Sequence, residues 1–85
     1  MILRASIVVT GELGLHARPA AELSKLVQAS NHQVFITNQA GKRVSGSSLL
    51  EILTLGVQAG ESISFEVEGP DAEQLLEQLK AVVAG

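Results

Sequence analysis

The sequence contains no cysteine and no tryptophan or tyrosine. The absence of cysteine excludes disulfides, thiol chemistry and metal sites made of thiolates. Two phenylalanines are the only aromatic residues, and nine acidic residues are scattered among six basic ones. Such a chain offers neither a platform for stacked bases nor a surface that follows a phosphate backbone, so we expect no nucleic acid as a partner.

Long apolar runs are also missing. No run approaches the ~20 residues that a membrane-spanning helix requires, and Arg4 interrupts the apolar start with no small-residue cleavage site behind it. The chain is nevertheless 46% hydrophobic and 18% charged, which is typical of a folded protein and not of a disordered one. Its length suits one domain. We therefore expect residues 1–85 to form a single domain that is a cytoplasmic monomer and does not contact a membrane.

The spacing of apolar residues predicts the element order β-α-β-β-α-β-α. Apolar residues at alternate positions indicate strands with one buried face at 3–9 and 62–68, and a β-branched and aromatic run followed by turn residues indicates a hairpin over 34–45. Apolar residues at helical spacing indicate helices with one apolar stripe. Such elements bury their apolar sides best in two layers, so we expect an α+β fold with helices on one side of an antiparallel sheet. The predicted strands are residues 3–9, 34–37, 42–45 and 62–68, and the predicted helices are residues 17–30, 48–55 and 71–83.

The run from Gly14 to Ala20 puts a histidine and an arginine where a loop meets the first long helix. The first turn of a helix has unpaired N–H groups and a partial positive charge, which stabilise an anion there by up to ~2 kcal/mol. Neutral imidazole is nucleophilic near pH 7, so His16 can accept a phosphoryl group beside Arg18. The alternative is that His16 merely caps the helix and that Arg18 is a solvated surface charge.

The second histidine, His32, receives a different interpretation. It lies in a predicted turn between a helix and a strand and has no partner nearby in the sequence, so we interpret it as an ordinary surface residue. Two isolated histidines without a carboxylate at ligand spacing do not make a metal site. We accordingly expect no metal and no cofactor.

The run from Gly14 to Ala20 matches the GLHARPA signature of HPr proteins, the histidine-containing phosphocarriers of the phosphoenolpyruvate-dependent phosphotransferase system. The resemblance covers nearly the whole chain, because residues 48–56 and 60–69 are similar to the family's second helix and last strand. It implies an open-faced β-sandwich with a four-stranded antiparallel sheet and three helices on one side. It also implies phosphorylation of His16 at the nitrogen nearer the backbone, with the phosphate held at Ala17 and Arg18.

The same resemblance implies the partners. Phosphorylated Enzyme I would be the donor and an EIIA-type protein the acceptor, in sugar transport or a related branch, so the chain would be a stoichiometric carrier and not an enzyme.

The predicted helix 48–55 is apolar on nearly every side, which predicts that part of it faces a partner. The alternative is that neighbouring loops enclose this helix. We expect the partner surface to consist of Leu15, Leu49, Leu50 and Leu53.

Ser48 matches the position of the serine that a dedicated kinase modifies in many HPr proteins, which makes such a kinase a candidate partner. A capping box formed by Ser48 and Glu51 is a sufficient structural reason for this serine. Glu51 itself stands where the family commonly has a small or basic residue, which disfavours docking on an acidic Enzyme I surface.

Two other functions fit the element order, a ferredoxin-like module that senses a small molecule and a regulator with the carrier fold but no transfer. Retention of His16 with Arg18 argues against the second.

Overall fold

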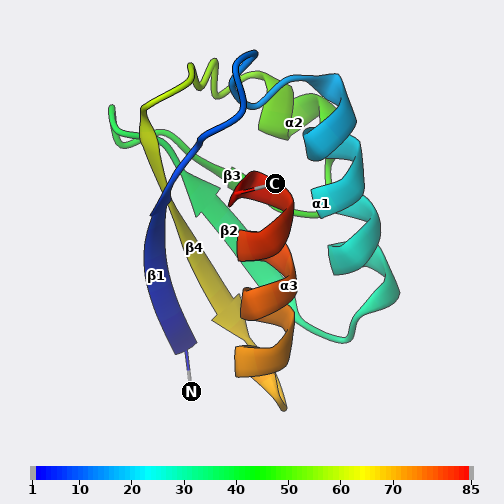
Figure 1. Ribbon diagram of the computed structural model, residues 1–85. Helices are drawn as coiled ribbons and strands as arrows, with labels where there is room; N and C mark the ends of the chain where they lie inside the picture. Colours follow the sequence, from blue (N-terminus) through cyan, green and yellow to red (C-terminus); the bar gives the residue numbers. More distant parts are fainter. Residues whose placement is uncertain (1, 85) are drawn as a thin grey trace.

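The computed structural model describes residues 2–84, in which three helices cover one face of a four-stranded sheet (Figure 1). The element order is the predicted one, and the bounds differ from the predicted bounds by at most two residues. The α+β fold expected from the apolar pattern is therefore confirmed. The strands are β1 (Ile2–Val8), β2 (Gln33–Thr37), β3 (Arg43–Ser45) and β4 (Ser62–Glu68), and the helices are α1 (Ala17–Ala29), α2 (Leu49–Leu53) and α3 (Ala72–Ala84).

The sheet has the order β1-β4-β2-β3, and all neighbouring strands are antiparallel. The last strand in the sequence, β4, thus lies between β1 and β2 (Figure 1). Phe65 in β4 is opposite Ala5 of β1 on one side and Ile36 of β2 on the other, and its side chain is fully buried. Because side chains alternate along a strand, this register turns the apolar residues of β4 toward the helices and its polar residues toward the open face.

On the open face, Glu66 of β4 lies between two arginines. Its carboxylate accepts a hydrogen bond of 3.0 Å from Nε of Arg43, and Arg4 approaches it at 3.6 Å from the other side. The guanidinium of Arg43 also stacks over the ring of Phe35. The hydrogen bond from Arg43 lowers the pKa of Glu66, burial opposes this change, and the charges of Arg43 and Arg4 add to the lowering.

His32 is half-buried and has a partner, so its interpretation as an ordinary surface residue is wrong. Its Nε2 forms a hydrogen bond with the carbonyl oxygen of Pro70, in the turn between β4 and α3. A side chain at Gly69 would collide with the imidazole, because a Cβ there would lie 2.6 Å from Cδ2 of His32. The ring therefore joins the turn after α1 to the turn before α3. No local sequence pattern predicts a contact between residues so far apart in the chain.

Asp71, the first residue of the predicted helix 71–83, lies directly before α3 and does not have the backbone of a usual N-cap. Its φ of 55° lies in the left-handed region, whereas N-cap residues are normally extended. Asp71 is thus the last residue of the turn between β4 and α3, which also contains Gly69 and Pro70. None of the helices within residues 2–84 combines the length and the apolar character needed to cross a membrane.

Candidate functional site at the start of the first helix

His16 is the N-cap residue of α1 and has the extended backbone typical of that position, with φ −84° and ψ −172°. Its carbonyl oxygen accepts the N–H of Ala20 at 3.1 Å, but its side chain makes no capping hydrogen bond. The imidazole is exposed. His16 therefore caps the helix through its backbone alone, so capping does not occupy its ring nitrogens.

The loop before His16 is held by two backbone contacts. The N–H of Leu15 donates to the carbonyl oxygen of Val57 at 3.0 Å, and the N–H of Gly14 donates to Gly11 at 2.9 Å. Gly14 has a φ of 67°, and a Cβ at this position would lie 2.3 Å from the oxygen of Val57. Only glycine satisfies both requirements, so Gly14 allows the loop to lie close against the segment that follows α2.

The first turn of α1 provides the electrostatics of the site. The N–H groups of Ala17 and Arg18 belong to the donors that have no carbonyl partner within a helix, and Pro19 has no N–H that would need one. Both Ala17 and Arg18 are exposed, and no acidic residue lies in this turn. The start of α1 therefore offers two backbone donors and a guanidinium to an anion attached to His16.

His16 and Arg18 line a surface hollow of about 460 Å³ together with residues of the β1–α1 loop and of the last turn of α3. The hydroxyl of Thr10 donates to the carbonyl oxygen of Ala84 at 3.1 Å and so ties this loop to the end of α3. The contribution of α3 was not predicted. Its last turn carries small and apolar residues that give no signal of a site, and its position results from how α3 lies across the sheet.

Helix α2 packs against α1 (Figure 1). The hydroxyl of Ser48 accepts the N–H of Glu51 at 3.2 Å, as a capping box requires. The carboxylate of Glu51, however, accepts the N–H of Ser45 at 3.2 Å and not that of Ser48. Half of the predicted box is thus present, and Glu51 instead holds the end of β3 against the helix.

The leucines expected to contact partners differ in accessibility. Leu50 is 77% exposed and Leu53 is 36% exposed, whereas Leu49 is partly buried against the core. Leu15 is only 5% exposed and belongs to the core, because its N–H bond to Val57 draws it beneath the loop. The structure therefore does not support the expectation that Leu15 contacts a partner directly. An apolar surface at α2 consists of Leu49, Leu50 and Leu53, which we call the α2 surface.

Within residues 2–84 no group of three or more histidine, cysteine, aspartate or glutamate side chains lies close enough together to hold a metal ion.

Comparison with family models gives a match over residues 3–85 to the model described as the PTS HPr component phosphorylation site. The chain is 34% identical to phosphocarrier protein NPr of Escherichia coli strain K12, with 99% of this chain and 90% of that protein covered. It is 36% identical to phosphocarrier protein HPr of Vibrio cholerae, with 91% and 89% covered.

The chain is also 39% identical to the multiphosphoryl transfer protein of Salmonella typhimurium, and the match covers 99% of this chain. It spans only 23% of the length of that relative. Among solved structures, the HPr protein of Bacillus anthracis is similar with a TM-score of 0.88 and 34% identity, and the match covers 96% of both chains.

These comparisons agree with the signature around His16 and with the observed architecture of one sheet covered by helices on one side. They confirm the predicted open-faced β-sandwich, and they give no support to the ferredoxin-like sensing module. The chain belongs to the HPr family of phosphotransferase-system phosphocarriers.

Proposed function

We propose that this chain accepts a phosphoryl group on His16 and passes it to another protein. The observation that carries the proposal is the exposed imidazole of His16, which makes no capping hydrogen bond and stands at the first turn of α1 beside Arg18. A neutral imidazole attacks phosphorus with the lone pair of its unprotonated nitrogen while the bond from phosphorus to the donor breaks. By the family resemblance this nitrogen is Nδ1, the one nearer the backbone.

The site suits reversible transfer because it holds the phosphoryl group only modestly. Backbone donors at a helix start contribute up to ~2 kcal/mol, and each ~1.4 kcal/mol changes the transfer equilibrium about tenfold. Arg18 is 85% exposed, so water screens its attraction for the phosphate. A phosphohistidine in this setting is stabilised enough to form and remains able to pass its group on.

The partners we propose are phosphorylated Enzyme I as the donor and an EIIA-type protein as the acceptor. Both would dock on the α2 surface, which by the family resemblance lies next to the active histidine and which exposes Leu50 and Leu53. Residues 1–85 would form one domain and act as a monomer in the cytoplasm. The chain would be a stoichiometric carrier, which receives one phosphoryl group from the donor for each group that it passes on.

The chain's second histidine provides a matched control for a test of this function. Incubation with phosphoenolpyruvate and Enzyme I should add one acid-labile phosphoryl group, seen by intact-mass spectrometry. His16→Ala should abolish the added mass, whereas His32→Asn should retain it provided that circular dichroism shows a folded protein. Labelling that persists in His16→Ala would contradict the assignment of His16.

We further propose Ser48 as a site for regulation by a serine kinase. Its hydroxyl lies at the start of α2 next to the α2 surface, so a phosphate there would add about −1.5 to −2 charges to the docking region. Ser48→Asp should slow loading by Enzyme I, and Ser48→Asn, which keeps a capping side chain without the charge, should not. Equal loading rates for the two variants would contradict the proposal that phosphorylation of Ser48 regulates the carrier.

A further inference from the structure

Arg18, the arginine of the phosphoryl site, has a partner that belongs to no part of the family signature. Its Nε lies 3.8 Å from Oε1 of Glu22, one helical turn further along α1, and both side chains line the hollow that contains His16. Glu22 is 53% exposed, so it can reach the guanidinium without a large desolvation cost. The arginine that would contact the phosphate is thus paired with a carboxylate when the histidine carries no phosphate.

We infer that Glu22 is a positioning residue that competes with the phosphoryl group for Arg18 and thereby makes phosphorylated His16 easier to discharge. The inference rests on the proposed function of His16. Before loading, Glu22 holds the guanidinium at the edge of the hollow. After loading, the guanidinium must leave Glu22 to contact the phosphate oxygens, and the loss of the ion pair lowers the stability of the phosphohistidine.

The geometry of the pair shows that it can be exchanged. Arg18 precedes Glu22 by four residues, and a helical pair in which the acid precedes the base is more stable than this order. The contact is also long and involves a single nitrogen, whereas a phosphate can accept two charge-assisted hydrogen bonds from one guanidinium. A phosphoryl group on His16 therefore outcompetes Glu22, but at the cost of the existing pair.

The magnitude follows from the exposure of the two side chains. Exposed ion pairs between residues four apart on a helix correspond to a factor of about two in an equilibrium constant. Glu22 would shift the transfer equilibrium by that factor and would not abolish transfer.

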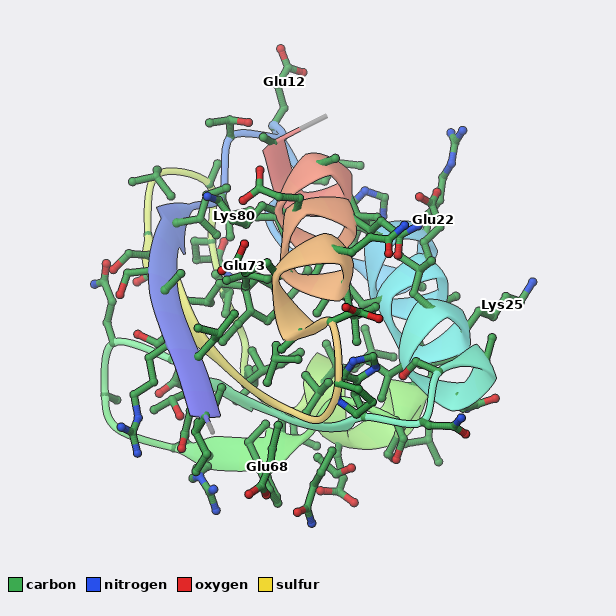
Figure 2. All side chains as sticks on the ribbon, turned by 90° about the horizontal axis from the view of Figure 1, so that it is seen from below. Glu12, Glu22, Lys25, Glu68, Glu73 and Lys80 are labelled. Carbon is green, nitrogen blue, oxygen red and sulfur yellow. The ribbon has the colours of Figure 1, made fainter. Side chains whose placement is uncertain are left out.

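Glu22 and Lys25 both project from α1, and Glu12 points outward from the β1–α1 loop (Figure 2). Glu12 therefore offers an acidic control outside the helix.

The test is an exchange equilibrium between two forms of the protein. Phosphorylated wild type labelled with ¹⁵N is mixed with unlabelled Glu22→Gln and a catalytic amount of Enzyme I, and intact-mass spectrometry gives the phosphorylated fraction of each form at equilibrium. We expect Glu22→Gln to hold the phosphoryl group about twofold more strongly than the wild type. This preference should diminish toward one at high salt, because salt screens exposed charges.

A double-mutant cycle separates an action through Arg18 from a direct repulsion of the phosphate by Glu22. In the Arg18→Ala background, Glu22→Gln should no longer change the exchange ratio. An unchanged preference in that background would show direct repulsion and overturn the positioning role. Glu12→Gln should give a ratio near one in the wild-type background, and an effect equal to that of Glu22→Gln would also overturn the inference.

The outcome for Glu22 is distinct from the outcome for the proposed function. If the wild type takes up no phosphoryl group from Enzyme I, the proposed function fails before the exchange is measured. If the wild type is loaded on His16 and the exchange ratio with Glu22→Gln is one, the function holds and the role of Glu22 is refuted. A shift of the Arg18 Nε resonance on phosphorylation, present in the wild type and altered in Glu22→Gln, would show the exchange of partners directly.

Discussion

Leu50 provides the sharpest test of how the carrier meets its partners, because it is the most exposed residue of the α2 surface. With 77% of its surface exposed, Leu50 contributes little to the core. The substitution Leu50→Glu should therefore change the free energy of unfolding by no more than about 0.5 kcal/mol. It should nevertheless weaken docking, since it replaces an apolar contact by a charge that a partner would have to desolvate.

The size of the effect follows from the exposed area. Full burial of a leucine contributes ~1.5–3 kcal/mol, so covering the exposed part of Leu50 contributes about 1–2 kcal/mol, or roughly tenfold in binding. The cost of burying the carboxylate adds to this loss. We expect the Michaelis constant to rise at least about tenfold both for loading by Enzyme I and for transfer to the acceptor, because both partners would use the same surface.

Steady-state transfer rates at several concentrations of the carrier measure the two constants, with circular dichroism to verify the fold. Val8→Glu is the matched control, because Val8 is an exposed apolar residue on the face of the sheet that the helices leave open. It should leave both constants unchanged. Ile52→Ala in the same helix should instead cost about 2–5 kcal/mol of stability, because Ile52 is fully buried. Normal transfer by folded Leu50→Glu would refute docking through α2.

Three further predictions concern the site and the sheet. Arg18→Ala should slow transfer by about tenfold or more with little change in melting temperature, because its side chain is 85% exposed and would, by the proposed function, contact the phosphate and not the core; a large loss of stability with normal rates would contradict this. Gly14→Ala should cost at least about 2 kcal/mol, measured by urea unfolding, because its Cβ would collide with the oxygen of Val57. The folded-state pKa of Glu66 is lowered from 4.5, first by its hydrogen bond with Arg43, so its contribution to stability is present above pH 4.5 and is lost as the pH falls through the folded pKa. The free energies of unfolding of wild type and Glu66→Gln, measured from pH 6 down to pH 2, should therefore differ less as the pH falls. A difference that stays constant over this range would contradict the contribution of Glu66.

The amino-acid sequence by itself indicated the elements and the histidine that we propose as the phosphoryl acceptor. The alternation of apolar residues predicts β1 and β4, because a strand with one buried face repeats every two residues, and the stripe in α1 and α3 repeats at helical spacing. A β-branched and aromatic run followed by turn residues predicts the hairpin of β2 and β3. The signature around His16 places the imidazole at a helix start, where the unpaired backbone donors follow from helix geometry alone. These properties depend on neighbours within a few residues, so they are readable before the chain is folded.

The tertiary structure alone decided which apolar side chains are available and which distant segments meet. Leu15 and Leu50 are the same residue type, but a backbone bond to Val57 buries the first and the outer side of α2 exposes the second. His32 finds its partner in Pro70, and the end of α3 reaches the hollow beside His16, only because β4 returns between β1 and β2. Contacts of this kind join residues that are far apart in the sequence, and no local periodicity encodes the pairing of distant strands.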